Sequence, residues 1–433
     1  MRKYNSVFSG GNPSWANACV GDNGSPGYWE YAKGFSVAAN ILIDATLDEE
    51  RPNLTVDEMI YPVCFNMRHS IELRIKWALG VVSAILKYKK IITLRLKKKE
   101  HDIGSIWTDF KLISETFDDR LAPLIERLSP FIQDIADIDP TGQTFRYPRN
   151  IKNKKHLVDV SVINFFILRE KFREIEELFD EMHRLIEYLY VEYESGTFTK
   201  HLSRQNILDI AKTLPRHSQW SSAEFDETKQ KICNKYSISN KEFSKCIDFI
   251  KNNFEMAPLI GLKVPLLGVN EEDIRSLFSV WHRHKRIYLN HSLKSVDSSE
   301  LATDYKKYLK DLSRRNKLDN AIWSMFGQHL SVEKIAGYSA LFYFARELGF
   351  SENYHLVYKI QFAETQGAAK SGEIQSAFFH IFQKLNLVKN ILRSLYFLRF
   401  NQLAENLVSE FQLESSIDWL DDARKLKFAP IWY

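Results

Sequence analysis

Apolar residues recur along this chain at intervals of three and four, which is the periodicity of amphipathic α-helices. In residues 28–47 they fall at Tyr28, Tyr31, Phe35 and Leu42, and they predict a first helix there. A longer stripe follows, and it predicts a second helix with one face in a core. Its members are Ile60, Cys64, Met67, Ile71, Ile75, Ala78, Val82 and Leu86.

The same periodicity continues through the rest of the chain. It predicts further helices at 101–113, 162–193, 204–214, 222–237, 240–253, 271–293, 300–328, 332–349, 353–365, 373–400 and 401–411. A glycine loop is expected at 366–373. Only 17 Gly and 12 Pro interrupt a chain that is 45% hydrophobic, so the pattern indicates an all-α protein rather than a sandwich or barrel. The segments do not repeat at a fixed period, which argues against a solenoid.

Turn-forming residues divide the chain into three parts. Residues 1–27 are rich in Gly, Pro, Asn and Ser, and they predict an irregular arm that Trp15 pins to the body. Residues 28–196 predict an up-and-down helical bundle, because a Ser-Gly pair ends its long last helix. Residues 197–433 predict a larger helical accessory region, with a candidate break into two lobes near 294–300.

The overall charge and the cysteines exclude several classes of protein. The formal net charge is +4, from 59 basic and 55 acidic residues, so it does not by itself indicate nucleic-acid binding. The four cysteines form no C-x-x-C pair and have no His at ligand spacing, so we expect no disulfide framework, no metal site and no cofactor. Apolar runs are too short to cross a bilayer, and we expect a cytoplasmic protein that does not enter a membrane.

Candidate chemistry is concentrated around the second helix. Arg68, His69 and Glu72 lie beside its apolar stripe, and His101 and Asp102 open the next helix. Charged residues spaced four apart on a helix also stabilise an exposed surface without any function, and that alternative stays open. If the row faces the core instead, these five residues would meet inside the bundle as a catalytic group.

Two basic clusters flank these residues and could attract phosphate. Each could also be an ordinary solvated loop. The candidate RNA- or phosphate-binding residues are Lys89, Lys90, Arg95, Lys97, Lys98 and Lys99 in the first cluster and Lys154 and Lys155 in the second.

Residues 28–195 resemble the HEPN superfamily, the small helical bundles of bacterial toxins, defence proteins and RNA-processing enzymes. The resemblance rests on the Tyr- and Ala-rich first helix (28-YWEYAKGF-35), the tract 61-YPVCFNMRHSIELRIKWAL-79, 101-HDI-103, the loop 145-FRYP-148 and the long helix after Val158 and Asp159. In active members an Arg, a polar neighbour and a His a few residues later form a metal-independent RNase site across a dimer. Arg68 and His69 match the first two positions, whereas positions 73–75 are Leu, Arg and Ile, so the expected His is absent.

The resemblance implies an endoribonuclease of bacterial defence, antiviral or toxin type, which acts on RNA as a homodimer formed through the N-terminal bundle. His would exchange protons with the ribose 2′-OH or the leaving oxygen, and Arg would neutralise charge on the phosphorus. The alternative is a non-catalytic module that binds RNA, a nucleotide or a protein and whose HEPN site is degenerate. Residues 197–433 could contact a protein partner in either case.

Overall fold

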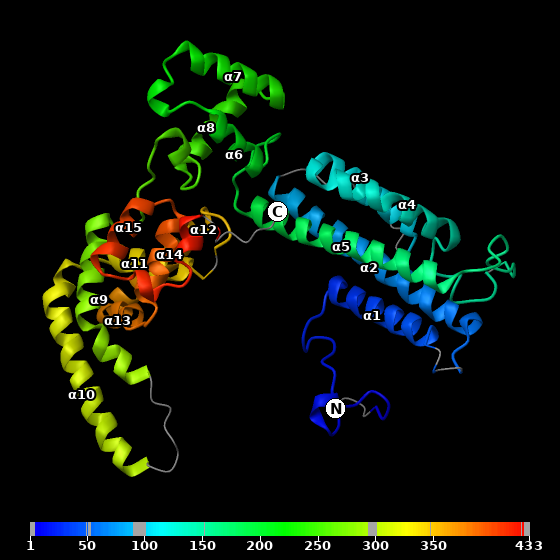
Figure 1. Cartoon of the computed structure of the whole chain (residues 1–433), viewed down its shortest axis with the longest axis horizontal. Coiled ribbons are helices and arrows are strands. Elements are labelled where there is room, and N and C mark those ends of the chain that lie inside the picture. The colour runs from blue at the N-terminus through cyan, green and yellow to red at the C-terminus, as the bar shows by residue number, and fades with distance from the viewer. Residues whose placement is uncertain are drawn as a thin grey trace. The chain divides into compact units, whose positions relative to one another are not determined.

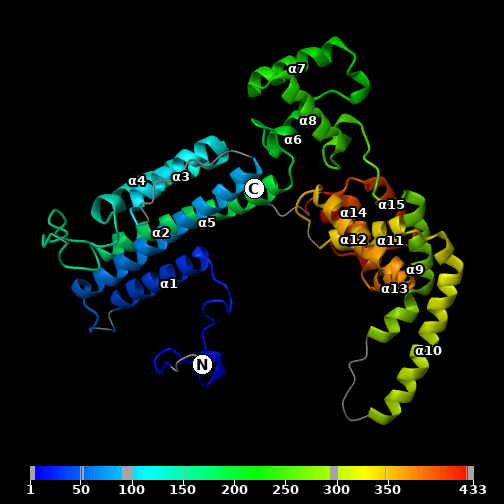
Figure 2. The ribbon, with the colours of Figure 1, turned by 180° about the vertical axis from the view of Figure 1, so that it is seen from behind.

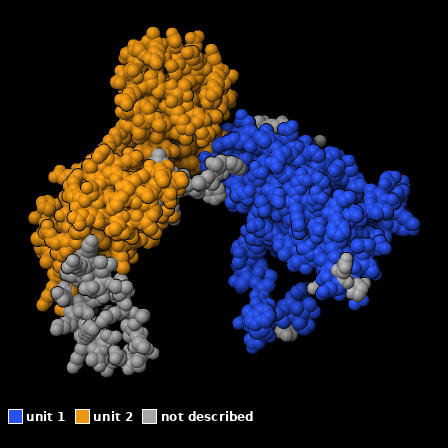
Figure 3. Space-filling view, in the orientation of Figure 1, with its two compact units in different colours: residues 1–190 blue, residues 191–433 orange. Residues whose placement is uncertain are grey.

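The structure is a computed structural model that describes residues 5–48, 50, 53–89, 101–150, 152–292, 301–346, 348–425 and 427. Within these ranges the regular elements are helices, sixteen of them α-helices, which confirms the all-α prediction (Figure 1). The chain separates into two compact units, unit 1 over residues 1–190 and unit 2 over residues 191–433 (Figure 3). Each unit is described by itself below.

Unit 1 contains five helices that pack side by side. They are α1 (Tyr28–Thr46), α2 (Val56–Tyr88), α3 (Ile103–Phe117), α4 (Ala122–Ile138) and α5 (Phe165–Glu194), the last continuing past the division. α1 lies along α2, α2 contacts α3, and α3 contacts α4. α5 reaches α1, α2 and α3 through the ring pairs Trp29–His183, Trp77–His183 and Trp107–Phe179. Views from the front and from behind show α1, α2 and α5 running together (Figures 1 and 2).

α2 is the central helix of unit 1. The predicted stripe is buried from Cys64 onward, and only Ile60, at its first turn, is partly exposed. Arg68, Glu72 and Arg74 are buried as well, because other helices cover more than one face of α2. A buried aliphatic side chain contributes about 1.5–3 kcal/mol, so this single helix supplies much of the core of the unit.

Two expectations for unit 1 were wrong. No helix was expected between positions 114 and 160, yet α4 occupies 122–138, where Leu124, Leu128 and Ile132 recur every fourth residue and are buried. The side chains of residues 5–27 are all exposed, and Trp15 is 86% exposed, so Trp15 does not pin the arm to the body.

Unit 2 is built from the other helices, most of them shorter than those of unit 1. They are α6 (Arg204–Thr213), α7 (Ala223–Tyr236), α8 (Asn240–Asn252), α9 (Glu271–Ser292), α10 (Leu301–Phe326), α11 (Val332–Phe344), α12 (Asn353–Lys370), α13 (Ile374–Phe382), α14 (Leu387–Phe397), α15 (Asn401–Glu410) and α16 (Leu420–Arg424). Their buried residues form two hydrophobic clusters, one between Leu202 and Ile260 and the other between Phe254 and Ala423. Along the chain, one cluster therefore gives way to the other near 254–260, whereas the expected break at 294–300 lies outside the described residues.

Two helix boundaries in unit 2 differ from the sequence expectation. α12 continues through Gly367 to Lys370 and ends only where Gly372 adopts φ +76°, although a helical glycine costs about 1 kcal/mol. The segment expected as one helix at 373–400 turns at Lys384, between α13 and α14. Both pieces bury apolar residues in the same cluster, so the periodicity hides the turn.

Candidate functional site

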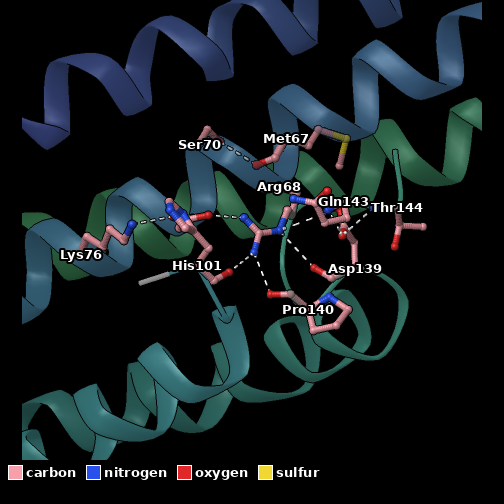
Figure 4. A network of polar contacts seen from close by, with 10 residues as sticks. Met67, Arg68, Ser70, Lys76, His101, Asp139, Pro140, Gln143 and Thr144 are labelled. Atoms are coloured by element: carbon pink, nitrogen blue, oxygen red, sulfur yellow. Dashed lines mark hydrogen bonds and ion pairs between the residues drawn. The ribbon is translucent and has the colours of Figure 1, made fainter. Parts of the chain in front are cut away.

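Arg68 is buried where α2 meets the beginning of α3 and the turn after α4 (Figure 4). Its Nε–H donates to the Asp139 carbonyl at 3.0 Å, and Nη2 donates to the His101 carbonyl at 2.6 Å and the Pro140 carbonyl at 2.8 Å. Nη1 donates to the Glu72 carboxylate. Four of its five N–H donors are therefore directed at the protein itself. We call this set of contacts the Arg68 clamp.

The turn that receives Arg68 is itself fixed by a buried carboxylate. Asp139 is 1% exposed, and its Oδ1 accepts the backbone N–H groups of Gln143 at 2.8 Å and Thr144 at 3.0 Å. Gly142 follows at φ +75°, and a Cβ there would lie 3.3 Å from Arg68 Nη1. The glycine thus allows both the turn and the close approach of the guanidinium.

Glu72 joins the clamp to His101. The carboxyl group is 2% exposed, and its Oε1 accepts Lys76 Nζ at 2.6 Å and lies 3.1 Å from His101 Nδ1. Burial opposes the charged form, but the hydrogen bonds from Lys76 and Arg68 outweigh it and hold the pKa of Glu72 below its usual value. Glu72 is therefore an anion near neutral pH, and a carboxylate can only accept a hydrogen bond from His101 Nδ1.

His101 is the accessible member of this group. Its side chain is 67% exposed, and nothing in the described residues hydrogen-bonds to Nε2. A carboxylate on one ring nitrogen fixes the orientation of the ring, while the other nitrogen can exchange a proton with a bound molecule. By this geometry the pair Glu72–His101 can act as an acid–base group.

The other two expected catalytic residues have different roles. His69 lies against rings, edge-on to Phe35 with centroids 4.5 Å apart and parallel to Phe65 with centroids 5.7 Å apart. Burial lowers the pKa of His69, so it is neutral near pH 7. Asp102 is the N-cap of α3 and accepts the N–H of Ser105 at 2.9 Å. The structure thus brings together Arg68, Glu72 and His101.

The basic residues expected to bind phosphate fall into three groups. Lys89 is half-buried and donates to the Phe117 carbonyl at 3.2 Å, and burial lowers its pKa. Lys90, Arg95, Lys97, Lys98 and Lys99 lie outside the described residues. Lys154 and Lys155 are exposed on the loop that follows α4, where Asn150 Oδ1 accepts the N–H of Lys154 at 3.0 Å.

Three features of the sites escaped the sequence analysis. The carbonyl groups that bind Arg68 carry no sequence signal, since any residue supplies them. Arg146, discussed below, was passed over as part of a loop. A second pair, His201–Glu242, joins residues 41 positions apart, and only the Ser239-x-x-Glu242 spacing of a capping box indicated that Glu242 begins a helix.

Within the described ranges, no group of three or more His, Cys, Asp or Glu side chains could hold a metal ion. None of the helices searched in those ranges is long and apolar enough to cross a membrane. Comparisons with family models, curated proteins and solved structures gave no match to this chain.

Proposed function

We propose that unit 1 is a metal-independent endoribonuclease of bacterial defence or toxin type, with His101 as its acid–base residue. The observation that carries the proposal is the exposed imidazole of His101, oriented by the buried Glu72 carboxylate. The four cysteines are free thiols, which fits the proposed cytoplasmic location.

The reaction needs only proton transfers from the protein, because the ribose 2′ oxygen of the RNA is itself the nucleophile. A general base removes the ribose 2′-OH proton, the 2′ oxygen attacks phosphorus, and the bond to the 5′ oxygen breaks as an acid protonates it. The products are a 2′,3′-cyclic phosphate and a free 5′-OH. One His101 can perform one transfer, and in the proposed homodimer a second His101 would perform the other.

Arg68 has a different role here from the one that the HEPN resemblance implies. Its guanidinium is 4% exposed and is occupied by protein carbonyls and Glu72, so it positions His101 through the Arg68 clamp. Positive charge for the phosphate would come from Lys76, which is 20% exposed, and from exposed lysines such as Lys154.

The test is incubation of purified protein with total RNA and tRNA in EDTA. We expect cleavage that leaves 2′,3′-cyclic phosphate ends and is lost in His101→Gln. The matched control is His201→Gln, which alters a similar His–Glu pair in unit 2 and should cleave normally. Cleavage that persists in His101→Gln, or that EDTA abolishes, would contradict the proposal.

A second candidate function is non-catalytic RNA binding, and the occupied state of Arg68 favours it. In that case RNA retention would weaken steeply with salt, and no product would form under any condition tested. Wild-type protein that retains labelled RNA at low salt but never cleaves it would select this function over the first.

A further inference from the structure

Three partly buried rings of unit 1 and one guanidinium form a ladder that ends at the surface. Phe35 meets His69 edge-on, and His69 lies parallel to Phe65 at an interplanar angle of 7°. The guanidinium carbon of Arg146 lies 5.5 Å from the Phe65 ring centre and 5.3 Å from that of Tyr147. Each step is within the range of π-stacking or cation–π contact.

The outer end of this ladder is open to solvent. Arg146 is exposed and makes no ion pair with a described carboxylate, and the ring of Tyr147 is 48% exposed. The guanidinium lies close to the Phe65 and Tyr147 rings, with Nη2 3.5 Å from the Tyr147 hydroxyl, and the exposed ring of Tyr147 is available to a planar ligand.

The surroundings of Arg146 and Tyr147 carry positive charge, and this charge comes from the loop rather than from His69. Burial keeps His69 neutral near pH 7, so it supports Phe65 as an aromatic ring rather than as a second cation. The same loop also exposes basic side chains, namely Arg149, Lys152, Lys154 and Lys155. Aromatic faces bordered by a basic loop are the combination that binds single-stranded nucleic acid.

The ladder is connected to the candidate acid–base site. Arg146 lies on the loop whose first residues, Asp139 and Pro140, accept hydrogen bonds from Arg68. His69, the next residue of α2, supports the ladder, while Arg68 holds the backbone of His101. Adjacent residues of α2 thus contact both the ladder and the candidate acid–base site.

We propose that Arg146 and Tyr147, supported by Phe65 and His69, form a stacking platform for an unpaired base of single-stranded RNA. The RNA assignment rests on the proposed function. An unpaired base presents its face to the rings, whereas the faces of a duplex are covered by neighbouring base pairs. Phosphates on either side of the base would meet the basic loop, and the strand would be retained beside His101.

The experiment measures the affinity of the His101→Gln protein for a fluorescently labelled single-stranded RNA, the same RNA as a duplex, and single-stranded DNA of the same sequence. Tyr147→Ala in this background should weaken single-strand binding about 5- to 100-fold, the loss expected for one stacked base. Tyr147→Phe should restore it, and duplex affinity should not change. Tyr31→Ala, which removes a tyrosine that is 54% exposed on α1, is the control.

Arg146→Lys separates stacking from charge, because lysine keeps the cation and loses the planar group. We expect it to weaken single-strand binding while the salt dependence stays the same. Equal losses for single strand and duplex, or no loss in Tyr147→Ala protein with an unchanged circular dichroism spectrum, would overturn the platform. Tighter binding of the DNA strand would overturn the assignment to RNA.

Binding and cleavage are read separately, so the two proposals can fail separately. Cleavage that requires His101 but is accompanied by no Tyr147 effect on binding overturns the platform alone. A Tyr147-dependent affinity in protein that never cleaves RNA overturns the endoribonuclease alone.

Discussion

Two histidine–glutamate pairs, one in each unit, have similar geometry but differ in the other groups that donate hydrogen bonds to the carboxylate. His101 Nδ1 lies 3.1 Å from Glu72, and His201 Nδ1 lies 2.8 Å from Glu242. Both rings are exposed, 67% and 47%, and both carboxyl groups are buried or nearly so. By distance and exposure alone, either could be an acid–base pair.

The remaining donors separate the two pairs. Glu242 accepts the Thr199 hydroxyl and, at 2.8 Å, the backbone N–H of His201, so its partners are neutral groups of one short loop. Glu72 instead accepts the cations Arg68 and Lys76. Each carboxylate bridges two separate segments, Glu242 to residues 199–201 and Glu72 to His101, and the difference is that Glu72 also accepts two cations of its own helix.

The charge balance differs for the same reason. Arg68 and Lys76 both pair with Glu72, so two cations offset the carboxylate that faces His101. No described cation other than a protonated His201 pairs with Glu242, so that pair is negative when His201 is neutral. A phosphate group would be repelled at His201 and tolerated at His101, which is why His101 is the candidate.

The largest expected effect is loss of the Arg68 clamp. Arg68→Met leaves the buried Asp139 without its cation and removes one of the two cations of Glu72, and we expect the free energy of unfolding to fall by about 3–5 kcal/mol. The measurement is the midpoint of urea unfolding. Arg127→Met is the control, because Arg127 is 60% exposed and its ion pair with Glu181 should contribute less than about 1 kcal/mol. Equal losses in the two variants would show that the Arg68 clamp is not structural.

Replacing the carboxylate of each pair by an amide should lower the free energy of unfolding by unequal amounts. Glu72→Gln deletes the partner of two cations, and we expect a loss of about 2–3 kcal/mol, since hydrogen bonds to charged groups are the stronger kind. Glu242→Gln replaces bonds to neutral donors, and we expect a loss of about 1 kcal/mol in the same urea measurement. A larger loss for Glu242→Gln would contradict the charge comparison drawn above.

Acid should reduce the difference in stability between the wild-type protein and the Glu72→Gln variant. Burial opposes ionisation of Glu72, but Lys76 and Arg68 lower its folded-state pKa below the ordinary value of 4.5. The stability that the anion contributes is therefore complete above pH 4.5 and is lost as the pH falls below it. Urea midpoints of both proteins between pH 7 and pH 3 should converge at the acid end, and a gap that widens there would refute the assignment.

The smallest expected effect on stability comes from the histidines themselves. His101→Gln and His201→Gln alter exposed rings, so each should change the free energy of unfolding by no more than about 0.5 kcal/mol. The two variants therefore test function without a loss of folding. If His201→Gln and not His101→Gln abolished cleavage, the comparison between the pairs would be reversed.

Much of the fold was determined by local sequence alone. Helical periodicity depends only on which residues are apolar, so it predicted an all-α chain and the stripe of α2, including Cys64 and Ile75. It also placed Arg68 and Glu72 on one face, because residues four apart on a helix are neighbours. It also marks α4 through Leu124, Leu128 and Ile132, which the prediction missed, and it gives no sign that α12 continues through Gly367.

Only the tertiary structure decided what these residues do. The sequence left open whether Arg68 and Glu72 face solvent, and their burial at 4% and 2% excludes the exposed ladder. Arg68 binds carbonyl groups 33, 71 and 72 residues away, which no local pattern can encode. His69 is adjacent to Arg68 in sequence, but successive side chains on a helix point in different directions, so it stacks on Phe35 and Phe65. Periodicity records which face is apolar, and the chain's long-range packing determines which distant groups each face meets.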